Sequence, residues 1–233
     1  MNNFLTIIGA GLAGSEAAWQ AAERGVQVVL YEMRPVVRNP VHKTGNCAEL
    51  VCSNSLGNNQ PHSAPFILKE ELRSFNSIII ASGDKNSVPA GSALAVDRDL
   101  FSQEITEKLS NHPNITFKRE EVVEIPQEGP VIIATGPLTS PQLSEQISKL
   151  IGQEYLYFYD ALSPIVNADS IDYDKAFFAS RYDKGDADYL NCPMNAEQYY
   201  NFVRELKAGE KVEFASFEKP VYFEGCMPIE VLA

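Results

Sequence analysis

The chain has 233 residues, of which 45% are hydrophobic and 21% charged, and its formal net charge is −12. This composition is ordinary for a globular protein of one or two domains, and the acidic balance argues against a broad basic face for non-specific binding of nucleic acid. No apolar run reaches the roughly 18 residues that a membrane span requires. The first residues lack the basic region and cleavage site of a leader, so we expect a cytoplasmic protein with no membrane partner.

A glycine-rich turn follows the first predicted strand and opens a helix predicted over residues 13–24. Gly9 permits a tight turn, Gly11 lets the backbone approach a pyrophosphate, and Gly14 lets the helix pack closely on the strand. The unpaired N–H groups at the start of the helix favour an anionic group there. The pattern therefore predicts a pyrophosphate site formed by Gly9, Ala10, Gly11, Leu12, Ala13 and Gly14.

An acidic residue ends the second predicted strand, which covers residues 26–31. Glu32 follows Gly14 by 18 residues, the spacing at which a carboxylate accepts hydrogen bonds from a ribose diol. A carboxylate at this position repels a 2′-phosphate. The cofactor is therefore expected to be FAD or NAD rather than NADP.

The remaining elements alternate between strands and helices, which is typical of an α/β fold. A long ordered loop is predicted over residues 34–64, helices over 66–75, 98–109, 142–151 and 195–206, and strands over 115–119, 122–125 and 130–135, the last of them buried. Residues 77–81 are either an extension of the preceding helix or a short buried strand. Phe101, Ile105 and Leu109 share one helix face and are predicted to be core.

The strand at 130–135 runs into the small residues Ala134, Thr135 and Gly136. In this fold class a later strand ends beside the first βα turn, so these residues are expected to line the same cofactor site. From Tyr155 onward the chain is rich in Tyr, Phe and Asp. This segment is either a substrate-facing region at the edge of a second domain, or its aromatic residues are core.

The four cysteines are expected to be reduced thiols, because a cytoplasmic protein does not form a disulfide framework. A zinc site made of His42, Cys47, Cys52 and His62 is an alternative, but the spacings are wider than those of zinc ribbons. No metal is therefore expected. Cys47 and Cys192 are interpreted as small buried hydrophobic residues.

Several long blocks, in this order, carry a resemblance to one family. They are GAGLAGSEAAWQ (9–20), YEMRP (31–35), AELVCSNS (48–55), VPAGSALAVDRDLF (88–101), ATGPLTSP (134–141), EYLYFYDALSPIV (154–166), SRYDKG (180–185), YLNCPM (189–194) and VYFEGCMPIE (221–230). In these blocks the chain resembles the folate- and FAD-dependent tRNA (uracil-5-)-methyltransferases, the TrmFO family. The resemblance runs over essentially the whole chain.

The resemblance implies a Rossmann-like FAD-binding domain of glutathione-reductase type, interrupted by an inserted second domain. Residues 1–185 would belong to the FAD-binding domain and residues 186–233 to the start of the inserted domain. Family members methylate the T-loop uridine of tRNA, with methylenetetrahydrofolate as carbon donor and NAD(P)H as reductant of the flavin, and the protein is expected to be a monomer. Members are longer than this chain, so it is expected to be a fragment that need not be active alone.

The resemblance also assigns residues to roles. Arg34 joins the glycine turn, Glu32 and residues 134–136 as a cofactor-binding residue. Carbon 5 of uracil becomes nucleophilic only after a nucleophile adds to carbon 6, for which a thiolate is suited. By resemblance Cys226 is this nucleophile and Cys52 handles the proton of carbon 5.

A local pattern supports the assignment of Cys226, because Pro228 is well placed to begin a helix. A thiol just before a helix N-terminus has a lowered pKa.

Two other classes of function remain open. The chain could be a general flavin- or NAD(P)H-dependent oxidoreductase, in which the two cysteines are incidental. It could also be a non-catalytic protein that binds a dinucleotide or tRNA.

Overall fold

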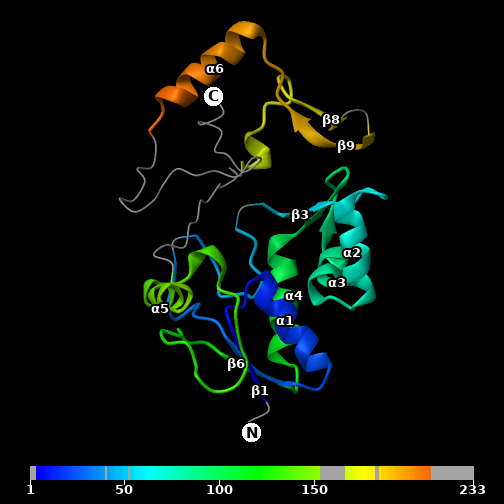
Figure 1. Ribbon diagram of the computed structural model, residues 1–233. Coiled ribbons are helices and arrows are strands. Elements are labelled where there is room, and N and C mark those ends of the chain that lie inside the picture. Colours follow the sequence, from blue (N-terminus) through cyan, green and yellow to red (C-terminus); the bar gives the residue numbers. More distant parts are fainter. Residues whose placement is uncertain (1–3, 40, 52, 153–165, 182–183, 211–233) are drawn as a thin grey trace. The chain divides into compact units, whose positions relative to one another are not determined.

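The computed structural model describes residues 4–39, 41–51, 53–152, 166–181 and 184–210 (Figure 1). Its contacts divide the chain into two compact units, Met1–Leu156 and Tyr157–Ala233. The boundary expected between residues 185 and 186 lies inside a strand of the second unit, so the two divisions do not coincide. The assignment of an FAD-binding domain and an inserted domain to the predicted ranges stays a prediction.

A four-stranded parallel sheet lies at the centre of the first unit, with the strand order β6-β2-β1-β7. The strands are β1 (Phe4–Ile8), β2 (Gln27–Tyr31), β6 (Ile115–Lys118) and β7 (Val131–Ile133). Their last residues are paired with one another in register, Ile8 with Tyr31 and Ile133, and Tyr31 with Lys118. The segments that follow the four strands therefore start at one edge of the sheet.

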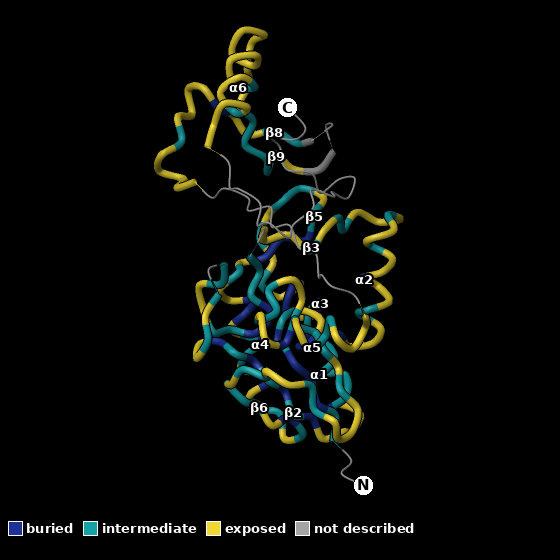
Figure 2. Tube along the Cα trace, turned by 60° about the vertical axis from the view of Figure 1, so that its left-hand side comes forward, coloured by how far each residue is buried: buried dark blue, intermediate teal, exposed yellow. Residues whose placement is uncertain are grey.

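Helices α1 (Leu12–Glu23) and α4 (Arg98–Ser110) pack on this sheet, and α3 (Ile78–Lys85) packs on both of these helices. The core between them is dark blue in Figure 2. Its fully buried members include Ile7, Leu30, Ala18, Ile78, Phe101, Ile105 and Leu109. The predicted helices at 13–24 and 98–109 are confirmed, as is the buried face of the second.

A small antiparallel sheet adjoins this core, with the strand order β3-β5-β4. Its strands are β3 (Ser55–Asn58), β4 (Ser87–Val88) and β5 (Ala93–Val96), and α2 (Ala64–Ser74) contacts β3. The predicted loop over residues 34–64 is thus interrupted by a strand. Strands of two to four residues are too short for their alternation to be recognised in a sequence.

Residues 77–81 belong to neither of the two elements expected for them. Asn76 adopts a left-handed conformation with φ of 55°, which ends the preceding helix. The Ser77 hydroxyl then accepts a hydrogen bond from the backbone N–H of Ile80 and caps the separate helix α3.

The predicted strand at 122–125 is wrong. The strands β6 and β7 lie at opposite edges of a parallel sheet, roughly 14 Å apart at three strand spacings. Residues 119–130 run from the carboxyl end of β6 to the amino end of β7, across the full width of the sheet. They therefore form the connection between these two strands and not a strand of their own. The strand predicted at 130–135 exists as β7, but Ile132 is 38% exposed because β7 is an edge strand.

After β7 the chain forms the 3₁₀ turn η1 (Gly136–Leu138) and then α5 (Pro141–Ile151), which confirms the helix predicted over 142–151. Leu143 is the buried residue of α5, whereas Leu150 and Ile151 are exposed.

The described part of the second unit contains the 3₁₀ turn η2 (Ala168–Ser170), a hairpin of β8 (Phe177–Arg181) and β9 (Lys184–Asn191), and α6 (Ala196–Ala208). Asn195 and Gln198 form a capping box at the start of α6, and the helix predicted over 195–206 is confirmed. Tyr173, Phe177 and Phe178 are about half exposed, so the interpretation of these aromatic residues as core is wrong. No helix among the described residues is long and apolar enough to cross a membrane.

Candidate functional site

A cleft opens at the carboxyl edge of the parallel sheet, within the first unit. Its walls come from the segments that follow the four strands, together with η1 and α5. The lining residues are Ile8, Gly9, Gly11, Tyr31, Glu32, Met33, Arg34, Asn39, His42, Glu120, Glu121, Val122, Ala134, Thr135, Leu138, Thr139, Ser140 and Leu143. Ligands of open α/β sheets bind at this edge.

The three glycines of the turn differ in what they do. Gly9 has φ of 97°, and a Cβ there would lie 2.7 Å from the carbonyl oxygen of Ala134. A Cβ on Gly14 would lie 1.8 Å from the carbonyl oxygen of Gly9. Both residues are therefore required by the fold itself.

Gly11 is not required by the fold. Its φ of −69° suits any residue, and a Cβ built there meets nothing within 4 Å. The space above Gly11 is part of the cleft. The structure therefore leaves this glycine free to contact a ligand, which is the role predicted for it.

The glycine turn leads directly into the N-terminus of α1. Gly11 is its N-cap residue, no side chain caps the helix, and no acidic residue lies in the first turn. The first N–H groups and the positive end of the helix dipole favour an anion at such a position. A pyrophosphate fits both the missing Cβ and this charge.

Glu32 is buried and follows β2, as predicted, but its carboxylate already has protein partners. Oε2 accepts from the backbone N–H of Ala10 at 3.1 Å, and Oε1 from the backbone N–H of Arg34 at 3.0 Å. The Arg34 guanidinium donates to both oxygens, from Nε at 2.9 Å and Nη2 at 3.1 Å. A ribose diol would replace one or more of the Arg34 hydrogen bonds.

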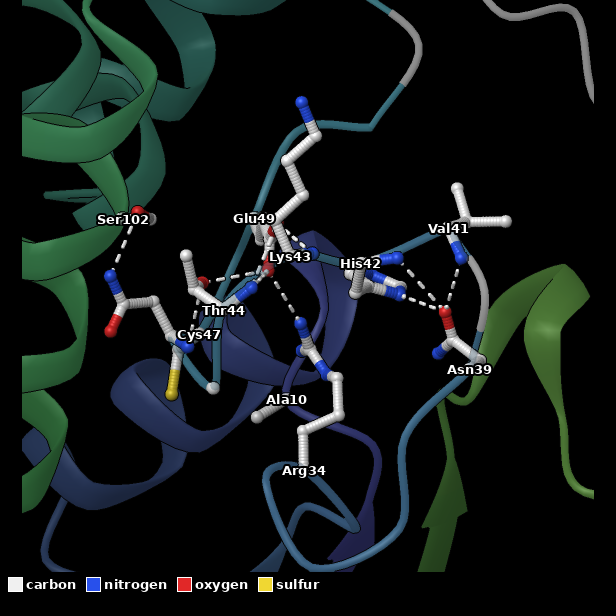
Figure 3. Close-up of polar contacts among 12 residues, drawn as sticks. Ala10, Arg34, Asn39, Val41, His42, Lys43, Thr44, Cys47, Glu49 and Ser102 are labelled. Atoms are coloured by element: carbon white, nitrogen blue, oxygen red, sulfur yellow. Dashed lines mark hydrogen bonds and ion pairs between the residues drawn. The ribbon is translucent and has the colours of Figure 1, made fainter.

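Arg34 also binds a second carboxylate. Its Nη1 donates to Glu49 Oε2 at 3.0 Å, and both side chains are largely buried (Figure 3). Glu49 accepts further hydrogen bonds from the backbone N–H groups of Lys43 and Thr44 and from the Thr44 hydroxyl. The buried charge of Arg34 is thus matched on both sides, and the loop that follows Glu32 is tied to the cleft.

These contacts set the ionisation of Glu32. Burial alone raises the pKa of this carboxyl group, but the hydrogen bonds and charge of Arg34 and the N–H of Ala10 oppose it and hold the pKa below its usual value. Glu32 is therefore an anion at neutral pH. It offers a ribose an acceptor and no donor.

Of residues 134–136, Ala134 and Thr135 lie against the glycine turn as expected. The backbone N–H of Ala134 donates to the carbonyl oxygen of Ile8 at 2.8 Å, and the Ala134 side chain lies close to Gly14. Ala134 and Thr135 line the cleft, whereas Gly136 begins η1 on the exposed side with φ of 62°.

Most of the predicted cofactor residues therefore meet at one cleft. Gly9, Gly11, Glu32, Arg34, Ala134 and Thr135 line it. Ala10 and Gly14 are buried behind them, and Leu12 and Ala13 are exposed in the first turn of α1. Whether these residues bind a cofactor stays a prediction.

Three residues of the site escaped the sequence analysis. Glu49 pairs with Arg34, Arg119 donates to the carbonyl oxygens of Arg34 and Gly45, and Asn39 lines the cleft. Asn39 and Glu49 lie in a loop without periodicity, and Arg119 directly follows β6. No pattern in the chain indicates these contacts.

The predicted catalytic cysteines, Cys52 and Cys226, lie outside the described residues. Cys47 is fully buried in the core, and burial raises the pKa of its thiol to about 11, so its interpretation as a small hydrophobic residue is confirmed. The same interpretation of Cys192 is wrong, because Cys192 is exposed. Among the described residues, no group of three or more His, Cys, Asp or Glu side chains could hold a metal ion.

A parallel sheet whose first strand passes through a glycine turn into a helix, with an acid after the second strand, defines a Rossmann-like α/β domain. A family model described as "Glucose inhibited division protein A" matches residues 5–233. The chain belongs to this family.

Curated relatives are similar in sequence to this chain over nearly its whole length. A protein of Bacillus subtilis (strain 168) is 59% identical over 229 residues, which are 98% of this chain and 52% of that protein. One of Listeria innocua serovar 6a is 60% identical over 233 residues, 100% of this chain and 54% of that protein. Both are named methylenetetrahydrofolate--tRNA-(uracil-5-)-methyltransferase TrmFO, which confirms the family resemblance. The chain spans about half the length of these relatives.

Among solved structures, Aquifex aeolicus GidA aligns with 54% of this chain and 21% of that protein, at 20% identity and a TM-score of 0.43. A likeness this low carries no argument about function.

Proposed function

We propose that the cleft binds FAD, with the pyrophosphate at the Gly11 turn and the first turn of α1. The observation that carries the proposal is Gly11, whose missing side chain serves no purpose in the fold. Space for a ligand, an uncapped helix N-terminus and an anionic acceptor lie together at this position.

Within this proposal each part of the site has one task. Residues 9–14 hold the pyrophosphate, Glu32 accepts from the ribose hydroxyls, and the small residues 134–136 leave room at the end of β7. Arg34 keeps the Glu32 carboxylate ionised and in place. Bound flavin would supply reducing equivalents for the reaction.

We further propose that the chain is part of an enzyme that methylates carbon 5 of a T-loop uridine in tRNA. Methylenetetrahydrofolate would be the carbon donor and NADH or NADPH the electron source. The support is the name shared by relatives at 59% and 60% identity over nearly the whole chain. A cytoplasmic location and a monomeric state remain part of this proposal.

The chemistry assigned to the cysteines follows from the substrate. The Cys226 thiolate would add to carbon 6 of the uracil, which makes carbon 5 nucleophilic. Once the methylene carbon is attached at carbon 5, Cys52 would take the proton from carbon 5 and tetrahydrofolate would leave from the methylene carbon. A hydride equivalent supplied by reduced flavin would complete the methyl group, and breaking of the S–C6 bond would release the Cys226 thiolate.

A tRNA mimic that contains 5-fluorouracil tests these two roles, because fluorine at carbon 5 replaces the proton that must leave. Cys226→Ala should abolish the covalent adduct. Cys52→Ala should retain the adduct with this mimic but lose methyl transfer to unmodified tRNA, and the exposed Cys192→Ala should behave like the parent in both assays. An adduct that survives Cys226→Ala and disappears in Cys52→Ala would show that the two roles are reversed.

The activity as a whole is tested by labelled methylenetetrahydrofolate and tRNA that lacks the modification. Label in the uracil methyl group, dependent on FAD and on NADH or NADPH, is the expected result. Oxidation of the nicotinamide without label in tRNA would instead indicate a general oxidoreductase. Bound FAD without either reaction would indicate a non-catalytic dinucleotide-binding protein.

A further inference from the structure

Arg119 binds two separate points of the loop that follows Glu32. Its Nη1 donates to the carbonyl oxygen of Arg34 at 3.0 Å and also to the carbonyl oxygen of Gly45. One side chain thus joins the beginning of this loop to a later part of it. Arg119 is not among the described residues that line the cleft, so these hydrogen bonds are not part of the direct contact with a ligand.

The sheet places Arg119 next to the start of the loop. β6 is the neighbour of β2 and parallel to it, and Tyr31 is paired with Lys118. The backbone N–H of Glu32 donates to the carbonyl oxygen of Lys118 at 2.9 Å, so the pairing continues as far as the residue before Arg119. The Arg119 side chain therefore begins beside the point at which the chain leaves β2.

A second contact holds the guanidinium group. Arg119 Cζ lies 4.2 Å from the centre of the Phe117 ring, which packs against the core. The ring attracts the cation, and the planar group can still donate from its edge. Within the described ranges, the contacts of this cation are a ring and two carbonyl oxygens rather than a carboxylate. Its charge therefore strengthens the hydrogen bonds to the loop backbone and is not used in an ion pair.

The two parts of the loop that Arg119 joins also pack on each other. A Cβ on Gly45 would lie 3.2 Å from Pro35 Cδ, so the chain at Gly45 passes close to Pro35. Asn39 and His42 lie between these two points in the sequence, and both line the cleft (Figure 3). The base that Arg119 closes therefore carries part of the cleft wall.

We infer that Arg119 is a positioning residue, which closes the base of the loop over residues 34–39 and 41–45 and so keeps this wall of the cleft in the shape that binds FAD. Hydrogen bonds from a charged donor are about twice as strong as neutral ones. A wall that is ordered before the ligand arrives also avoids the entropy cost of ordering it on binding. The inference rests on the proposed binding of FAD and adds a residue that acts on it through the loop.

Limited proteolysis with trypsin tests whether Arg119 closes the loop. Arg38 lies in the loop and its side chain is exposed, but a protease cuts the chain there only when the loop opens. Arg119→Met removes the donors and keeps an apolar chain over Phe117. Arg119→Gln is polar but shorter, so a change common to both variants is not an effect of the new side chain.

Arg24→Met is the matched control. Arg24 Nη1 also donates to a backbone carbonyl oxygen, that of Gln20 at 2.8 Å, but this bond lies within one helical segment outside the cleft. Thermal unfolding of each variant shows whether the fold is retained, and peptide mapping identifies the bond that trypsin cuts.

The expected result in both Arg119 variants is cleavage after Arg38 that is at least about tenfold faster than in the parent. A loop that is closed only about one tenth of the time also lowers the affinity for FAD about tenfold. Saturating FAD should suppress the cleavage, because a ligand that binds the closed loop shifts the population toward it. Arg24→Met should change neither quantity.

The alternative is that Arg119 attracts the anionic diphosphate through its charge alone. The loss of FAD affinity would then shrink as added salt screens the charge, and cleavage after Arg38 without FAD would match that of the parent. Under the inference the loss of affinity persists in high salt, and the cleavage is fast before any ligand is added.

Parent-like cleavage after Arg38 in folded Arg119→Met and Arg119→Gln, or parent-like affinity for FAD despite fast cleavage, would overturn the role of Arg119. If FAD binding is still weakened in Gly11→Val, either result leaves the proposed cofactor site intact. Failure of the parent protein to bind FAD would overturn the proposed function and the inference together.

Discussion

The guanidinium of Arg34 donates to both carboxylate oxygens of Glu32, from Nε to Oε1 at 2.9 Å and from Nη2 to Oε2 at 3.1 Å. The third nitrogen reaches Glu49. Arg34, which is predicted to bind the cofactor, is thus also a structural part of the cleft wall. Substitution here affects stability as well as binding.

Arg34→Met should lower the free energy of unfolding by about 3–5 kcal/mol, because it leaves two buried carboxylates without their cation. Urea unfolding at neutral pH measures the loss. Arg24→Met, at an exposed arginine of the first helical segment, should change stability by less than about 0.5 kcal/mol. Equal stability of the two variants would contradict the structural role of Arg34.

Stability should also fall in acid through Glu32. Its pKa is lowered in the folded protein, so its contribution is complete above the ordinary pKa of about 4.3 and is lost as the pH falls through the folded value. Unfolding measured from about pH 6 to pH 3 should show a smaller loss of stability in Glu32→Gln than in the parent. Glu104, whose pKa is also lowered, contributes to the loss in both proteins. Parallel curves would exclude Glu32 as a source of the acid sensitivity.

Cys47 and Cys192 should differ sharply in reactivity. Burial raises the pKa of the Cys47 thiol to about 11, so it is protonated and inaccessible near pH 8, whereas Cys192 is exposed. Brief alkylation of the native protein followed by peptide mapping should find label at Cys192 and almost none at Cys47. Full labelling at both sites is expected only in denaturant. Similar labelling of both in the native protein would show that Cys47 is not in the core.

The packing of α4 is tested by two adjacent residues. Phe101 is fully buried, whereas Leu100 is 54% exposed. Phe101→Ala should cost about 3–5 kcal/mol of stability, and Leu100→Ala less than about 1 kcal/mol. Chemical denaturation of the two variants measures the difference, and a loss of the same size in both would contradict the assigned helix face.

The sequence predicted the elements with strong local patterns. The glycine turn, the acid after β2 and the face of Phe101, Ile105 and Leu109 follow from spacing alone, because each depends on residues of one short segment. The meeting of Ala134 and Thr135 with the glycine turn followed from the fold class, which places a later strand beside the first.

What the sequence could not predict depends on contacts between distant segments. Residues 122–125 are rich in β-branched side chains, as a strand is, and only the sheet order shows that they belong to a connection that crosses from one edge to the other. The pairing of Arg34 with Glu49, and the hydrogen bonds of Arg119 to the loop, depend on how an aperiodic loop folds back. Charge and residue type alone do not define such contacts.

The central claim is that the cleft at Gly11 binds FAD, and titration of the purified protein with FAD, followed by flavin fluorescence, tests it most directly. The parent should bind one FAD per chain. Gly11→Val should lower the affinity by a factor of about ten or more without loss of the fold, since its Cβ meets no protein atom. Gly209→Val, at a glycine outside the cleft with φ of −62° and only ordinary contacts for a Cβ, should bind like the parent. Parent-like affinity in folded Gly11→Val, or no binding by the parent, would contradict the claim.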